Sequence, residues 1–198
     1  MRKRAFLFFF LLVSVLVVSC KGGGLAIISV EPRMVYEFSE EGEAEQFLFV
    51  FVKTEDCDEA RSMSLSCRDL SLSWRCLSPG RISKGLFYAA FSPAPSSTFS
   101  KSKYIAGLTD FYGGTVEQAF SLAYDESMAS LSEQEVLASK NFTTRYAYYG
   151  KSGRLEIFGE IDKDRDMLRK RKDLGGRRLC CVSQDGTTVC LFPYRKID

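Results

Sequence analysis

The stretch SMSLSCRDLSLSWRC, residues 62–76, decides the fold class because apolar and polar side chains alternate along both of its halves. In residues 62–67, Met, Leu and Cys occupy every second position and serine fills the others. Residues 70–76 repeat the pattern with Leu, Leu, Trp and Cys. A period of two places one kind of side chain on each face of an extended segment. The stretch therefore predicts two half-buried β-strands.

Other short apolar runs, separated by turn-forming residues, extend the β pattern over the first two thirds of the chain. Gln46–Lys53 is apolar at both parities, which is typical of a central strand covered on both faces. About seven strands over about 100 residues, with frequent turns between them, favour a β-sandwich. The remaining runs are Leu25–Val30, which we expect to end before Pro32, Gly85–Phe91, Tyr104–Leu108 and Val116–Tyr124, the last two joined by a turn at Asp110–Gly114.

The pair of runs Tyr104–Tyr124 resembles the last hairpin of an immunoglobulin-like or fibronectin-type domain. This resemblance implies an immunoglobulin-like antiparallel β-sandwich over residues 25–125. Cys67, Trp74 and Cys76 lie too close together for the Cys-Trp-Cys spacing of antibody domains, so another sandwich topology stays open.

A change of pattern separates this region from the end of the chain. Ser132 and Glu135 form a capping box, with Leu131 and Val136 at the positions of a hydrophobic staple, so residues 126–140 are predicted to form a short helix or linker. Residues 141–198 are again rich in strand-like runs. The sequence therefore predicts a mainly β protein, in which a β-rich C-terminal region too small for a large core of its own follows the sandwich.

The N-terminal segment has the pattern of an export signal. Arg2, Lys3 and Arg4 precede an uncharged run, Ala5–Val18, that is shorter than the roughly 20 residues needed to cross a bilayer. Val17-Val18-Ser19-Cys20 resembles the lipobox of bacterial lipoproteins, with valine in place of the commoner leucine. The resemblance implies a signal peptide over residues 1–19 and a fatty-acylated Cys20. An uncleaved membrane helix and an ordinary signal peptide with an incidental cysteine are the alternatives.

The residues after the lipobox fit a membrane-anchored protein. More than one acyl chain on Cys20 would give a stable anchor, and residues 20–24, with three glycines, would form a flexible tether. Lys21 stands where lipoproteins of the enteric inner membrane carry aspartate, which favours the outer membrane of the bacterial cell envelope.

Six further cysteines remain in the chain after Cys20, and an even number in an exported protein suggests disulfides. If Asp185-Gly186 is a two-residue hairpin turn, Cys181 lies opposite Cys190 at a non-hydrogen-bonded site, where a disulfide can form. Two free thiols are the alternative. Cys180 points to the other face, and its pairing with Cys57, Cys67 or Cys76 stays open.

A cluster of cations lies near the C-terminus. Residues 165–178 carry seven cations and two acids. Such a surface would contact anionic lipid head groups or phosphorylated glycans, whereas the simpler interpretation is a solvated face balanced by the acidic stretch 37–45. The cations that would make this contact are Arg169, Lys170, Arg171, Lys172, Arg177 and Arg178.

Composition limits the chemistry that we expect. The chain of 198 residues has 27 Lys+Arg, 25 Asp+Glu and no histidine, so histidine-based catalysis and histidine metal ligands are excluded. A charge near zero argues against a nucleic-acid binder. No nucleophile elbow, paired-carboxylate motif or regular calcium loop occurs. We expect no enzyme, metal or cofactor.

The sequence therefore predicts a lipid-anchored envelope lipoprotein with a non-catalytic structural or binding role. Its expected partners are the membrane and another envelope protein or glycan. A surface adhesin that binds a host component and a periplasmic hydrolase are the rival functions, and the oligomeric state is left open.

Overall fold

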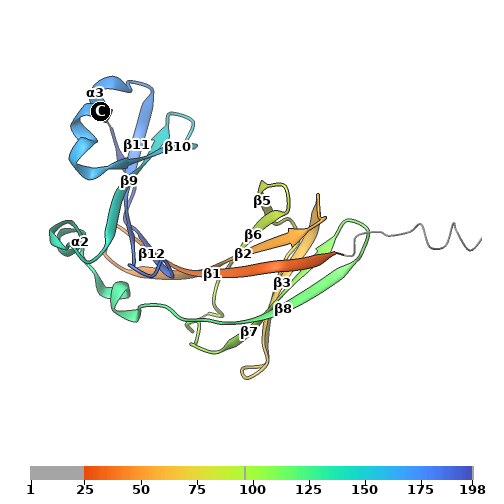
Figure 1. Ribbon diagram of the computed structural model, residues 1–198. Helices are drawn as coiled ribbons and strands as arrows, with labels where there is room; N and C mark the ends of the chain where they lie inside the picture. The colour runs from red at the N-terminus through yellow and green to blue at the C-terminus, as the bar shows by residue number, and fades with distance from the viewer. Residues whose placement is uncertain (1–24, 96, 198) are drawn as a thin grey trace, which may run out of the picture.

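The computed structural model describes residues 25–95 and 97–197, and it is mainly β, with two sheets and a few short helices. Figure 1 shows an elongated body formed by the first eight strands, with a C-terminal region that rises at an angle from one end of it. The first eight strands are β1 (Ala26–Phe38), β2 (Ala44–Glu55), β3 (Ala60–Cys67), β4 (Leu72–Cys76), β5 (Gly80–Ser83), β6 (Leu86–Phe91), β7 (Lys103–Asp110) and β8 (Thr115–Ser121).

Short helices and five further strands complete the described chain. They are η1 (Glu126–Ser130), α2 (Glu133–Ala138), β9 (Thr143–Gly150), β10 (Leu155–Glu160), η2 (Ile161–Lys163), α3 (Asp164–Lys170), β11 (Leu174–Val182), β12 (Thr188–Leu191) and β13 (Arg195–Lys196). The segment 126–140, predicted to form a short helix or linker, contains η1 and α2. The predicted C-terminal region contains β9–β13 together with η2 and α3.

Two sheets face each other in the first part of the chain. The smaller sheet has the order β4-β3-β7-β8, and the larger sheet has the order β10-β9-β11-β12-β1-β2-β6-β5, with β13 paired to β11. The predicted alternating strands of residues 62–76 are β3 and β4, which pair antiparallel in the smaller sheet. The protein is therefore mainly β, with two mostly antiparallel sheets that both contribute residues to the hydrophobic core.

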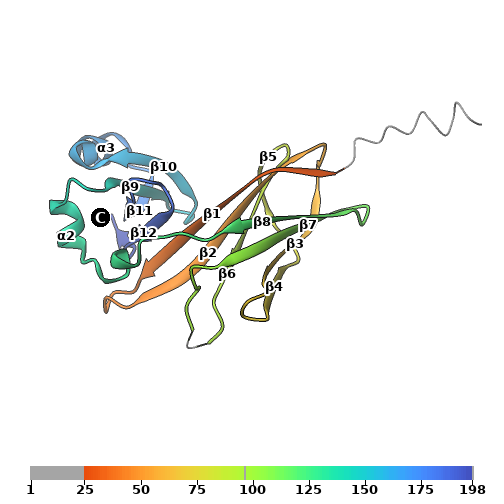
Figure 2. The same ribbon diagram turned by 60° about the horizontal axis from the view of Figure 1, so that its bottom comes forward.

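The β1–β2 hairpin connects the two parts of the molecule. It is longer than the strands of the smaller sheet, so its closed end extends beyond the sandwich (Figures 1 and 2). There β12 pairs with β1 in parallel, from Met34–Thr188 to Glu37–Leu191. One continuous sheet therefore runs from the sandwich into the C-terminal region.

The first strand does not end before Pro32, as its sequence predicted. Pro32 lies inside β1 and pairs with Val50 of β2, whereas β12 begins to pair only at Met34. A proline has no N–H to donate, so it is tolerated where one side of a strand has no partner. Pro32 occupies such an edge position, and the chain remains extended through it.

A single hydrophobic core extends through both parts. It contains Val50 and Leu65 from the two facing sheets, Met128 and Val136 from the connecting helices, and Leu179 from the C-terminal region, each 2% exposed or less. Phe38, at the end of β1, stacks on Phe192 after β12, with ring centroids 4.9 Å apart. The C-terminal region therefore packs against the sandwich.

The predicted capping box is confirmed. The Ser132 side chain accepts a hydrogen bond from the Glu135 N–H, and the Glu135 carboxylate accepts one from the Ser132 N–H at 2.8 Å. These two bonds begin α2, whose buried residue is the predicted staple residue Val136. In contrast, α3 was not predicted from the charged segment in which it lies.

Candidate functional site

One face of the large sheet packs on the core, and the other, here called the open face, carries the candidate site. Cross-strand pairs place Tyr88 beside Phe51 and Phe49 beside Arg33 on this open face. The same face continues through Val35–Val189 into the C-terminal strands. There it includes Val182, Cys180, Arg145 and Phe158.

The aromatic part of the open face contradicts the prediction that Gln46–Lys53 is covered on both sides. Leu48, Val50 and Val52 are fully buried in the core, whereas Phe47, Phe49 and Phe51 on the opposite side of β2 are only half-buried. The Tyr88 ring lies 6.5 Å from Phe49 and 6.1 Å from Phe51, between ring centroids. An antiparallel sheet usually turns polar side chains to water on such a face. On β2 this face instead carries a row of partly exposed aromatic side chains, with the charged residues Glu31 and Arg33 beside them on β1.

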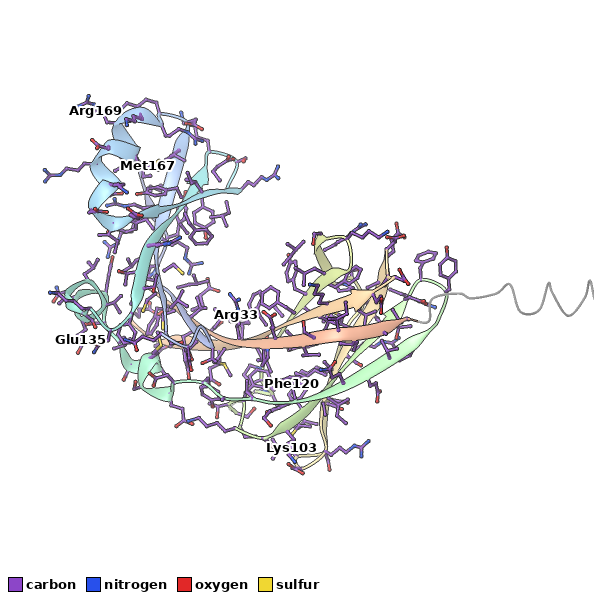
Figure 3. The ribbon with its side chains drawn as sticks, viewed as in Figure 1. Arg33, Lys103, Phe120, Glu135, Met167 and Arg169 are labelled. Atoms are coloured by element: carbon purple, nitrogen blue, oxygen red, sulfur yellow. The ribbon has the colours of Figure 1, made fainter. Side chains whose placement is uncertain are left out.

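A hollow of about 520 Å³ lies in the open face where the sandwich meets the C-terminal region. Figure 3 shows Arg33 rising from β1 into the angle between the two parts. The volume falls within the range of small-molecule pockets, roughly 300–1,000 Å³. The lining consists of Arg33, Thr143, Arg145, Phe158, Cys180, Val182, residues 183–186 and Val189.

The charges around this hollow are unequally paired. Glu37, on the same face, binds Arg178 at 2.8 Å. The Asp185 carboxylate accepts hydrogen bonds from Ser183 and Thr187 of its own turn, and these bonds lower its pKa. Neither Arg33 nor Arg145 forms an ion pair with any described residue. Arg33 instead lies over the Phe51 ring, 5.3 Å from its centroid.

The predicted basic cluster is divided by the fold. Arg177 forms an ion pair with Asp164 of α3, and its guanidinium lies 4.4 Å from the Tyr146 ring centroid. Tyr148 donates a 2.7 Å hydrogen bond to the same Asp164. Burial, together with this bond, raises the pKa of Tyr148. Arg177 therefore holds α3 on the sheet instead of facing an anionic surface.

Arg178 is likewise engaged, because it binds Glu37 and donates a 2.7 Å hydrogen bond to the Phe192 carbonyl. This pairing agrees with the simpler interpretation, in which the acidic stretch 37–45 balances some of the cations. Arg171 binds Asp173 through two hydrogen bonds, of 2.8 and 2.6 Å, and this lowers the Asp173 pKa to about 2.

The other predicted cations lie on the surface around α3. Arg169, Lys170 and Lys172 are exposed, and none forms an ion pair within the described part of the chain. Arg169, Arg171 and Lys172 line a shallow hollow of about 310 Å³ together with Lys151. Of the six predicted contact residues, Arg169, Lys170 and Lys172 are therefore the ones that have no ion-pair partner in the described part of the chain.

The register predicted for the last hairpin is confirmed, with Cys181 opposite Cys190 and Val182 opposite Val189. The predicted disulfide is not supported, because all six described cysteines are free thiols. Its premise of a two-residue turn is wrong. The Ser183 N–H donates to the Thr188 carbonyl at 2.9 Å, so residues 184–187 form the loop.

This longer loop changes the hydrogen-bonding phase of the hairpin. Leu179 and Phe192 are also a hydrogen-bonded pair, with 2.9 Å between the Phe192 N–H and the Leu179 carbonyl. Hydrogen-bonded pairs alternate along an antiparallel ladder, so Cys181–Cys190 is one as well. Side chains of such pairs lie farther apart than those of non-bonded pairs, which makes a disulfide less favourable.

Burial makes these thiols unreactive. Cys181 and Cys190 are fully buried in the core, and burial raises the pKa of Cys181 to about 12 and that of Cys190 further. Cys180 points to the open face, as predicted, and burial raises its pKa to about 11. The thiolate is the nucleophilic form, so these three residues make poor nucleophiles.

The remaining predictions concern the lipid anchor, membrane-spanning helices and metal sites. Cys20 and the lipobox lie outside the described residues. Within residues 25–95 and 97–197 no helix is long and apolar enough to span a membrane, and no group of three or more acidic or cysteine side chains is placed to hold a metal. Comparison with protein-family models, curated proteins and solved structures found no match.

Sequence reasoning missed the open face and its two arginines. The signal available was the run of phenylalanines in Gln46–Lys53, which is too apolar for a strand with a solvated side. Arg33 and Arg145 are isolated cations more than a hundred positions apart in the chain, and only the pairing of β1 with β12 brings them to one hollow.

Proposed function

We propose that this chain is a lipid-anchored lipoprotein of the bacterial cell envelope that acts by binding, without catalysis, through the open face of its large sheet. The observation that carries the binding role is the partly exposed row Phe47, Phe49 and Phe51, on the side of β2 that faces away from the core. Membrane attachment would occur through acylated Cys20, and the outer membrane is the proposed location.

The position of β1 supports this arrangement. The described chain begins at Leu25, directly after the glycines of the proposed tether, and Ala26 starts β1 at the end of the sandwich far from the C-terminal region (Figure 1). A tether at this end would leave the open face and the C-terminal region away from the attachment point.

We also propose that the sandwich is immunoglobulin-like. Its sheet orders β1-β2-β6-β5 and β4-β3-β7-β8 correspond to strands A-B-E-D and C′-C-F-G of that fold. Trp74 departs from the antibody pattern, because it lies on β4, at the C′ position, and packs 5.4 Å from Phe99.

A tyrosine at the corner before β7 gives independent support. Tyr104, fully buried near the start of this strand, donates a 3.1 Å hydrogen bond to the Ser100 carbonyl four residues upstream. Immunoglobulin-like domains carry such a tyrosine corner at the start of strand F, which is the position of β7.

Labelling with radioactive palmitate in a bacterial host tests the anchor. The wild-type chain should incorporate label and sediment with membranes, and Cys20→Ala should lose both properties. Cys76→Ala is the matched control, because Cys76 is a half-buried thiol of β4 and should leave labelling unchanged. Label retained in Cys20→Ala at the wild-type level would refute the anchor.

Protease treatment of intact cells distinguishes the orientations. A protein that faces the periplasm should be cut only after the outer membrane is ruptured. Cleavage in intact cells would instead favour the surface adhesin.

A further inference from the structure

We propose that the hollow at the bend of the open face binds a small amphipathic anion, in which a single apolar chain ends in one carboxylate or phosphate. This deepens the proposed binding function by naming the ligand class. The inference rests on Arg33 and Arg145, which line the same hollow from the two parts of the molecule.

The two arginines are available to a ligand. Arg33 comes from β1 and Arg145 from β9, and both are exposed without an ion-pair partner in the described chain. Guanidinium groups bind carboxylate and phosphate oxygens through charge-assisted, often bidentate hydrogen bonds. The placement of Arg33 over the Phe51 ring orients its guanidinium beside apolar surface.

Three acidic side chains near the hollow are already engaged, including Glu160, which lies opposite Arg145 in the β9–β10 pair. Glu37 binds Arg178, Glu160 binds Lys163, and the Asp185 carboxylate is satisfied within its own turn. Glu31 lies on the same face of β1, toward the sandwich and away from β12. Among the residues that line the hollow, Asp185 is acidic while Arg33 and Arg145 are basic, so an added anion would balance the excess positive charge.

Thr143, Ser183, Gln184 and Asp185 give the lining a polar part, and Phe158, Cys180, Val182 and Val189 give it an apolar part. The apolar part comes from Val182 of β11, Val189 of β12, the un-ionised thiol of Cys180, and Phe158 of β10, which is 50% exposed. These groups offer a ligand contacts for its chain and no hydrogen bonds. A simple inorganic ion would leave this surface unused, which is why the ligand class requires an apolar chain.

Calorimetric titration with laurate, below the concentration at which it forms micelles, tests the proposal. The protein is the chain from Lys21 to Asp198, because every residue of the core cluster lies between Met34 and Phe192. We expect saturable binding of one laurate per chain. Dodecanol has the same chain without the charge, and its affinity should be lower than that of laurate by at least about tenfold.

Three variants separate the two parts of the ligand. Arg33→Gln and Arg145→Gln should each weaken laurate binding about tenfold and leave dodecanol unchanged. Phe158→Ala should weaken both ligands. Arg75→Gln is the matched control, since Arg75 is an exposed, unpaired arginine on β4 of the other sheet, and it should change neither affinity.

The outcomes are decisive in both directions. Equal affinity for laurate and dodecanol, laurate affinity unaffected by both arginine substitutions, or no saturable binding would overturn the proposal. Circular dichroism melts of each variant exclude loss of folding as the cause. The protein used here carries no lipid anchor, so a negative result would leave the palmitate experiment on Cys20 to judge the anchor separately.

Discussion

The two ends of the large sheet bury their core-facing sides in different ways. In the sandwich, β1, β2 and β6 pack against a complete second sheet, so that Val50 and Leu65 meet across two layers. In the C-terminal region short helices take this place: η1 and α2 add Met128 and Val136 to the core, and Asp164 of α3 binds Arg177 of β11 and Tyr148 of β9. The second arrangement depends on the first, since β12 joins it to β1.

This difference teaches how a small β-rich region is stabilised without a large core of its own. A region of this size buries too little surface for much independent stability. It gains a parallel strand pair with the β1–β2 hairpin and shares the core through Phe38 and Phe192. The open face extends over both ends, so ligand binding at the bend would also be sensitive to their coupling.

A matched pair of core substitutions should have the largest effect and tests whether the two ends of the large sheet differ in stability. Leu65 in β3 and Leu179 in β11 are 1% and 2% exposed, and truncation of either to alanine should lower the free energy of unfolding by about 3 kcal/mol. In Leu179→Ala, amide hydrogen exchange should accelerate first in β9 and β11, while β3 and β7 stay protected. Leu65→Ala should accelerate exchange throughout.

The pattern of hydrogen exchange shows whether the two ends of the large sheet unfold separately or together. Equal acceleration in all strands for both variants would mean that the two ends unfold as one unit. The distinction drawn between them would then be wrong.

The buried thiols of the C-terminal region should make its stability depend on alkaline pH. Burial raises the pKa of Cys181 to about 12 and that of Cys190 further, against about 8.5 for an unfolded cysteine. Above about pH 8.5 the unfolded chain loses protons that the folded chain retains. Stability therefore falls as the pH rises, by up to about 1.4 kcal/mol per pH unit for each thiol.

Urea unfolding in a reducing buffer between pH 8 and 10 measures this slope. The double variant Cys181→Ala/Cys190→Ala should show a flatter pH dependence, although its stability at pH 7 is lower. A slope equal to that of the wild type would mean that these thiols do not contribute to it.

Substitution at the tyrosine corner should cause the smallest loss of unfolding free energy, and it affects only the sandwich. Tyr104→Phe removes the hydrogen bond to the Ser100 carbonyl and should cost about 1 kcal/mol in urea unfolding. Tyr112→Phe is the control, because Tyr112 is 97% exposed and should leave stability unchanged. A neutral Tyr104→Phe would remove one of the two supports for the immunoglobulin-like topology.

The local features predicted from sequence are those that depend on neighbouring residues. The alternation in residues 62–76 predicted β3 and β4, the Ser132–Glu135 pair predicted the start of α2, and the pairing of Cys181 with Cys190 followed from the Asp185–Gly186 turn. The prediction that Cys181–Cys190 is a non-hydrogen-bonded pair was wrong, because a hydrogen bond between Ser183 and Thr188 makes the loop longer than two residues.

The candidate site could not be derived in the same way. Nothing local distinguishes Arg177 and Arg178, which the fold pairs with Asp164 and Glu37, from Arg169, which it leaves exposed. These partners lie 13 and 141 positions away along the chain. Whether a cation is neutralised therefore depends on which strands become neighbours.

The sequence by itself determined that this protein is built mainly of strands and where its short connecting helix begins, because side-chain periodicity and capping act within a few residues. Only the tertiary structure decided which side of the Phe47–Phe51 run stays uncovered and which arginines meet at the bend. The physical reason is that burial and ion pairing are set by sheet order. Sheet order here depends on a contact between β1 and β12, which lie at opposite ends of the chain.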